Sequence, residues 1–220
     1  TTVKVGAAVT ISESGIEASG IGITCANING TQIGGRRNLV INGSMMVAQR
    51  GTSDTSTNGI GTVDRFHIIR SGVDENPTQQ QVDVSSGTTP YTLGFRKAFK
   101  VTNGNQTSGA GSSDYITMRY KIEAQDMANS GWNYTSSSSF VTLSFWAKSS
   151  VAQNFYGYLY THDGTAQAYA FETGSLTADT WKKVVLKIPG NSNLQFDNDN
   201  DVGLDIYISQ FWGTDRTDGG

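Results

Sequence analysis

The chain has 220 residues, of which 36% are hydrophobic and 26 are glycine, and its net charge is −3. Nine Phe, nine Tyr and four Trp supply the apolar area of a packed core, which argues against disorder. No run of Lys or Arg exceeds two residues. Without a basic run we expect no nucleic-acid binding. No apolar stretch approaches the roughly 20 residues that cross a bilayer, so we expect no membrane insertion.

Residues 1–35 differ in composition from the rest of the chain. They contain no aromatic residue, and small β-branched residues recur between glycines, as at Ile16, Ile21, Ile28 and Ile33. Such a segment forms short strands but has too little apolar area to bury alone. We therefore interpret it as a β-rich stalk whose core is shared by three identical chains. A partly ordered linker is the alternative.

Residues 36–220 read as a succession of strands with turn signals between them, the pattern of a sandwich or jelly roll. Leu39 to Ile41 predicts a short strand before an Asn-Gly turn. Glu123 to Asn129 predicts a helical turn at the sandwich edge. The main predicted strands are 63–69, 79–84, 96–101, 115–122, 140–147, 154–160, 168–171, 181–188 and 204–211.

Two groups of motifs resemble known proteins. Residues 38–51, with Asn42-Gly43-Ser44-Met45 and Gln49-Arg50-Gly51, and residues 62–66 resemble a domain of tail fibres and other virion appendages of marine or cyanophage-type bacteriophages. Residues 120–126, 141–150 and 180–183 resemble strands of carbohydrate-binding-module-like jelly rolls. The resemblance implies an all-β chain: a short fibre stalk at 1–35, then an antiparallel jelly-roll sandwich at 36–220. The family usually continues with further strands, so we expect the sandwich to be truncated at its C-terminal end.

The resemblance also implies a function. We expect a structural and adhesive subunit of a tail fibre or capsid appendage, located on the virion and displayed at its extracellular surface. The expected partners are two further copies in a homotrimer, other virion proteins and a host cell-surface glycan. A free-standing carbohydrate-binding module of a bacterial polysaccharide-active enzyme is the first alternative, and a polysaccharide-degrading spike is the second.

Aromatic side chains are the candidate glycan-binding residues, because flat rings stack on the C–H faces of sugars. Trp132 and Tyr134 lie in one predicted loop. Tyr156, Tyr158 and Tyr160 alternate along one strand and therefore share one face of a sheet. That face is either a stacking platform or the inward face of the strand, and the sequence leaves both readings open.

Three carboxylates, Asp197, Asp199 and Asp201, offer oxygen ligands for a hard cation such as calcium. The jelly-roll resemblance adds to this reading, since such modules often hold a structural calcium. A solvated turn is the alternative, because the spacing does not match the helix–loop–helix calcium motif. Apart from this calcium we expect no cofactor.

Catalytic patterns are not evident in the sequence. The chain has no Gly-x-Ser-x-Gly nucleophile elbow and no paired-His metal motif. His67 and His162 are far apart in the chain, and the acids in the most recognisable motifs, Asp64 and Glu123, read as members of structural ion pairs. We therefore predict no catalytic residues and a chain that is not an enzyme.

Overall fold

The computed structural model describes residues 9–12, 15–18, 27–28, 31–32 and 38–216. All strand pairs in these residues are antiparallel. Two short α-helices and one 3-10 turn are the only helical elements in the described ranges. The prediction of an all-β fold is confirmed. None of the described helices is long and apolar enough to span a membrane.

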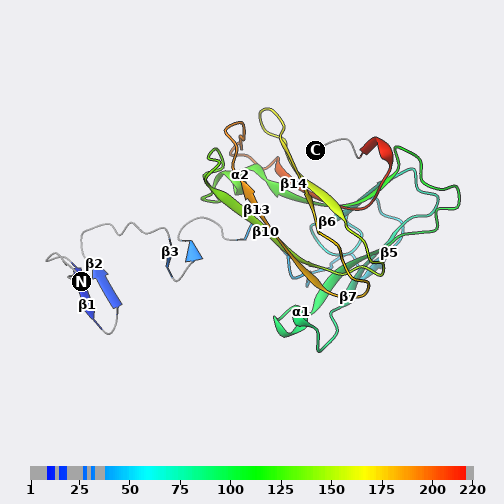
Figure 1. Ribbon diagram of the computed structural model, residues 1–220, viewed down its shortest axis with the longest axis horizontal. Helices are drawn as coiled ribbons and strands as arrows, with labels where there is room; N and C mark the ends of the chain where they lie inside the picture. Colours follow the sequence, from blue (N-terminus) through cyan, green and yellow to red (C-terminus); the bar gives the residue numbers. More distant parts are fainter. Residues whose placement is uncertain (1–8, 13–14, 19–26, 29–30, 33–37, 217–220) are drawn as a thin grey trace.

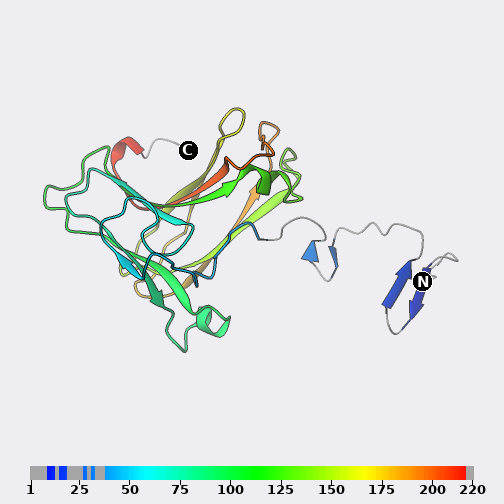
Figure 2. The ribbon, with the colours of Figure 1, turned by 180° about the vertical axis from the view of Figure 1, so that it is seen from behind.

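The largest sheet has five strands in the order β12-β11-β14-β9-β6. It forms one layer of the sandwich (Figures 1 and 2). Its strands, in chain order, are β6 (Phe66–Ser71), β9 (Tyr115–Glu123), β11 (Tyr156–Thr161), β12 (Ala168–Glu172) and β14 (Val202–Trp212).

The second layer consists of two smaller sheets. One pairs β10 (Phe140–Ala147) with β13 (Lys182–Pro189), and the other has the order β5-β7-β8. Its strands are β5 (Ser53–Asp54), β7 (Thr78–Asp83) and β8 (Lys97–Thr102). The short elements are α1 (Thr89–Thr92) between β7 and β8, α2 (Ala124–Ala128) after β9, and η1 (Thr214–Arg216) after β14.

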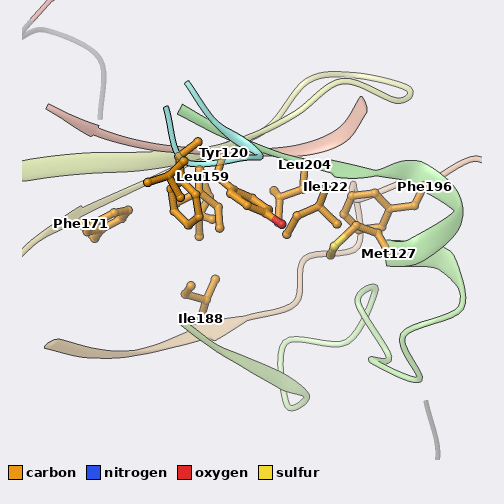
Figure 3. Packing of buried hydrophobic residues seen from close by; sticks show 11 residues of the cluster. Tyr120, Ile122, Met127, Leu159, Phe171, Ile188, Phe196 and Leu204 are labelled. Carbon is orange, nitrogen blue, oxygen red and sulfur yellow. The ribbon is translucent and has the colours of Figure 1, made fainter. Parts of the chain in front are cut away.

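Alternation of side chains places one face of each strand in the core. In Figure 3, Ile188 on β13 lies across from Leu159 and Leu204 on the five-stranded sheet. Phe99 on β8 packs against Phe66 on β6, with ring centroids 5.9 Å apart. Both halves of the second layer therefore cover the same sheet, and one core joins them.

The predicted strand over Leu39 to Ile41 is wrong. Residues 38–40 lie outside any strand, and a turn begins at Ile41. The reason is that the backbone of Ile41 hydrogen-bonds a side chain rather than another strand. Its N–H donates to the Tyr120 hydroxyl at 2.6 Å, and its carbonyl accepts from the same hydroxyl at 3.0 Å.

The N-terminal region contains two hairpins. β1 (Val9–Ser12) pairs with β2 (Gly15–Ala18), and β3 (Asn27–Ile28) pairs with β4 (Thr31–Gln32). These short strands agree with the β-rich character predicted for residues 1–35. Most of the predicted stalk lies outside the described residues, so its shared core and its boundary with the sandwich remain predictions.

Candidate functional site

The outward face of the five-stranded sheet carries a band of aromatic residues. In β11, Gly157, Leu159 and Thr161 are buried, whereas Tyr156 is 55% exposed and Tyr158 and Tyr160 are partly exposed. The trio therefore points away from the core, which excludes the inward reading, and its role in glycan binding stays a prediction. Its members come from the strand that also supplies Leu159 to the core.

Strand register extends this band across the sheet. Tyr158 lies opposite Tyr207 of β14, which in turn lies opposite Arg119 of β9. The Tyr158 and Tyr207 rings are stacked, with centroids 4.5 Å apart and planes at 19°. The Trp212 ring lies 5.5 Å from that of Tyr158, and its indole N–H donates to Thr117 at 2.7 Å. We call Tyr156, Tyr158, Tyr160, Tyr207 and Trp212 the aromatic platform.

A glycine near the start of β11 makes this close packing geometrically feasible. A Cβ on Gly157 would lie 2.3 Å from the Tyr207 carbonyl oxygen and 2.5 Å from the Phe171 ring. Only glycine leaves room there for the neighbouring strand and the core ring. The platform therefore depends on a residue of the opposite face of the same strand.

Asp205 lies beneath the platform and has no exposed side-chain surface. It accepts hydrogen bonds from Arg119 on both carboxylate oxygens, the one from Nε at 2.9 Å, and from the Tyr207 hydroxyl at 3.0 Å. The His162 Nε2 lies 2.7 Å from its Oδ2. A buried carboxylate requires such a set of partners, and here the partners fix three side chains of the outward face.

Burial and the charges of this network shift pKa values of side chains on the outward face. Burial opposes the charge of Arg119, but its hydrogen bonds to Asp205 raise the pKa of the guanidinium above its ordinary value. Burial, and then the Asp205 charge, raise the pKa of Tyr207. Burial, followed by Lys121 and Arg119, lowers the pKa of His67 to about 4. Burial also raises the pKa of Tyr158, so Tyr158 and Tyr207 are neutral at neutral pH while Arg119 keeps its charge.

Trp132 and Tyr134 lie apart from this platform. Both are partly buried and pack against the core cluster. The Tyr134 ring meets Phe196 edge-on, with centroids 4.9 Å apart, and the Trp132 ring lies 6.3 Å from that of Tyr134. The five predicted glycan-binding residues therefore fall into two places, with the tyrosine trio on the outward face and the loop pair at the core boundary.

Asp205, Tyr207 and Trp212 were missed as site residues by sequence reasoning. A signal existed in the alternation of β14, where Leu204, Ile206 and Ile208 point to the core and leave Asp205 and Tyr207 on the other face. The sequence does not show which strands flank β14, so it could not bring these residues to Tyr158.

The predicted calcium ligands do not converge on a cation site. Asp199 accepts a hydrogen bond from the Asp201 backbone N–H at 3.1 Å, as in a solvated turn, while Asp197 accepts one from the Gln195 amide. Within the described residues, no group of three or more His, Cys, Asp or Glu could hold a metal ion. The calcium prediction therefore gains no support from the geometry.

Comparisons with known proteins give little information about this fold. No family model and no curated protein matches the chain. One solved structure, the enzymatically active domain of tailspike protein 4 of bacteriophage CBA120, is similar with a TM-score of 0.44 and 14% sequence identity. The match covers 80% of this chain and 20% of that one. A likeness of this strength establishes neither a shared fold nor a shared activity.

This comparison nevertheless corrects one prediction. We predicted that the chain is not an enzyme, and the similar structure is described as an enzymatically active domain. The prediction is contradicted and is not retained. The sequence argument behind it relied on missing local motifs, and carboxylate pairs of polysaccharide-degrading enzymes are placed by the fold rather than by spacing.

Proposed function

We propose that this chain is an adhesive subunit of a bacteriophage tail fibre or other virion appendage that attaches to host-surface glycans through the aromatic platform. The observation that carries the proposal is the row of Tyr158, Tyr207 and Trp212 on an outward sheet face, in which the two tyrosines are stacked and the Trp212 ring is tilted against Tyr158. Rings of this kind offer flat apolar surfaces to the C–H faces of sugars.

Polar groups beside the rings suit the same ligand. The Arg119 guanidinium lies 5.5 Å from the centre of the Tyr207 ring, and the His162 ring lies 5.1 Å from that of Tyr160. Sugar hydroxyls need donors and acceptors at the margin of a stacking surface. Because Asp205 holds Arg119, Tyr207 and His162, these groups are pre-organised and lose little entropy on binding.

The proposal includes the expected assembly. Three copies joined through residues 1–35 would present three platforms, and linked weak sites raise the effective concentration at the second contact. Other virion proteins would hold the assembly on the particle. Light scattering of the full chain tests the trimer. A free-standing carbohydrate-binding module is the alternative, and a stable monomer that binds glycan would favour it.

Replacement of Tyr158 by alanine tests the platform. The variant is compared with the unchanged chain on an array of purified bacterial capsular and lipopolysaccharide glycans. We expect affinity for bound glycans to fall about fivefold, since one aromatic stacking contact is worth on the order of 1 kcal/mol.

Tyr91→Ala is the matched control, because Tyr91 lies in α1, beside Arg96 and away from the five-stranded sheet. It should leave glycan affinity unchanged. The proposal fails if the unchanged chain binds no glycan on the array. It also fails if Tyr158→Ala and Tyr91→Ala bind glycans equally well.

A further inference from the structure

A cation without a carboxylate partner lies beside the aromatic platform. Lys121 of β9 is directly opposite Asp205 of β14. Its neighbours in the strand, Tyr120 and Ile122, are buried in the core, so Lys121 points to the outward face, where it is partly exposed. It is also the diagonal neighbour of Tyr207, and such neighbours lie roughly 7–8 Å apart. Lys121 and a platform ring are therefore close enough to contact one ligand.

The carboxylates nearest to Lys121 are held by other cations. Arg119 donates to both carboxylate oxygens of Asp205. Glu123, which shares the outward face of β9, lies 3.7 Å from the guanidinium of Arg65. Lys121 itself forms no ion pair among the residues that the structure describes. Three cations thus lie beside two carboxylates, and one positive charge is left without a partner.

The charges of this region also act on the next strand. His67 of β6 lies opposite Arg119. Burial lowers the pKa of His67 to about 4, and the charges of Lys121 and then Arg119 contribute next to the shift. A positive potential therefore extends over β9 and β6. Because the whole chain carries a net charge of −3, this potential is a local feature that attracts an anion to one part of the surface.

A further carboxylate of the outward face lies at its opposite edge. Glu172 of β12 follows the buried Phe171 and is exposed. It accepts a hydrogen bond from the Asn154 amide at 2.6 Å. Three strand spacings, roughly 14 Å, separate β12 from β9, so Glu172 is too far away to pair with Lys121. An acidic ligand on this face would therefore place its anionic group over β9 and away from β12.

We propose that the aromatic platform binds an acidic glycan, in which the carboxylate of a sugar residue pairs with Lys121 while the sugar chain stacks on the tyrosine rings. The inference rests on the proposed function, since it names the class of glycan that the platform takes. The lysine ammonium offers three donors to a carboxylate. Arg119 is less suited to this contact, because its guanidinium already donates to Asp205.

The first test compares acidic polysaccharides with their carboxyl-reduced forms. Reduction turns each uronic acid into the corresponding neutral sugar and keeps the linkages. We expect the unchanged chain to bind capsular polysaccharides that contain uronic acids, and to bind their reduced forms about fivefold more weakly. Sodium chloride at about 0.5 M should diminish this preference, because salt screens exposed charges. The inference is overturned if all bound glycans are neutral, or if the reduced forms bind equally well.

The second test is Lys121→Met, which keeps a long unbranched side chain and removes the charge. It should weaken the binding of the acidic polysaccharide about fivefold and leave that of the reduced form unchanged. Lys121→Arg, which keeps the charge, should retain the preference for the acidic form.

Lys100→Met is the matched control for the loss of charge. Lys100 is exposed on β8, in the second layer, and its replacement changes the net charge of the chain by the same amount. It should leave the affinity for both polysaccharides unchanged. Equal affinities of Lys121→Met and Lys100→Met for the acidic polysaccharide overturn the inference, and urea unfolding checks that both variants are folded.

Tyr158→Ala separates this inference from the proposed function. If Tyr158→Ala weakens the binding of acidic and reduced polysaccharides alike, and Lys121→Met weakens neither, the platform stands and the acidic preference fails. If Lys121→Met removes the preference and Tyr158→Ala leaves glycan affinity unchanged, the platform proposal fails and the carboxylate contact of Lys121 stands.

Discussion

The two layers of the sandwich present different outward faces to solvent. The face of the five-stranded sheet carries stacked aromatic rings above Asp205, which is fully buried and hydrogen-bonded to three side chains. The face of the β10–β13 pair carries single exposed groups: Val185 is 58% exposed, and Lys187 lies 3.8 Å from the centre of the Phe140 ring.

This contrast teaches that exposed apolar area alone does not define a binding surface. Val185 is 58% exposed and Tyr156 of the aromatic platform is 55% exposed, so exposure does not distinguish the two faces. Tyr207 has both a stacked neighbour and a hydrogen bond to Asp205. Pre-organised groups lose less entropy when a ligand binds, so the network beneath the rings distinguishes the two faces.

The largest expected effect comes from removing the centre of that network. Asp205→Ala should lower the free energy of unfolding by about 3 kcal/mol, because it leaves the partly buried Arg119 without its counter-charge. Urea denaturation measures the change. Glycan affinity should fall as well, since Tyr207 and His162 lose the acceptor that orients them.

Asp83→Ala is the control for this prediction. Asp83 also forms a close ion pair, with Lys97 at 2.6 Å, but its side chain is 82% exposed. Its loss should cost less than about 1 kcal/mol, because solvent screens a surface pair. Equal destabilisation by the two substitutions would show that the Asp205 network is no stronger than a surface contact.

A smaller effect is expected on the pH dependence of folding stability, and its source is His67 at the margin of the same face. The pKa of His67 is lowered to about 4 from 6.5, by burial and then by Lys121 and Arg119. Below about pH 6.5 the unfolded chain binds a proton that the folded chain does not, so stability is lost as the pH falls towards 4. The neighbouring charges are Lys121, Arg119, Asp205 and Arg50.

His67→Gln should remove this dependence. Between pH 7.5 and pH 5, the free energy of unfolding of the unchanged chain should fall by about 1 kcal/mol more than that of the variant, a value reduced for partial exposure. Urea midpoints at the two pH values measure the difference. Parallel pH profiles for His67→Gln and the unchanged chain would contradict the prediction.

The smallest effect is expected on the β10–β13 face. Val185→Thr keeps the β-branched shape of an exposed strand residue and should change the free energy of unfolding by no more than about 0.5 kcal/mol. Glycan affinity on the same array should not change. A loss similar to that of Tyr158→Ala would show that both outward faces take part in binding.

Parts of the fold were predictable because they rest on local patterns. The alternation over Tyr115 to Ile122 predicted β9, and the helix-like stretch Glu123 to Asn129 predicted α2. Leu39 to Ile41 has the same apolar character as a strand, but the hydroxyl of Tyr120 takes its backbone hydrogen bonds. Because Tyr120 lies 79 residues away, no local pattern could reveal this.

The candidate site was only half predictable for a similar reason. The spacing of Tyr156, Tyr158 and Tyr160 alone placed them on one face, since side chains alternate along a strand. Whether that face points outward depended on which residues of β11 the second layer covers. Trp132 and Tyr134 had the same composition signal and lie instead at the core boundary.

The sequence by itself determined that this protein is built from strands, because the period-two pattern and the turn residues are properties of each segment alone. The tertiary structure decided what the strands present. The contact between Asp205 and Arg119 joins residues 86 positions apart, and the stacking of Tyr158 on Tyr207 depends on the register of β11 with β14. Strand order and register follow from the packing of the whole core, which no single segment encodes.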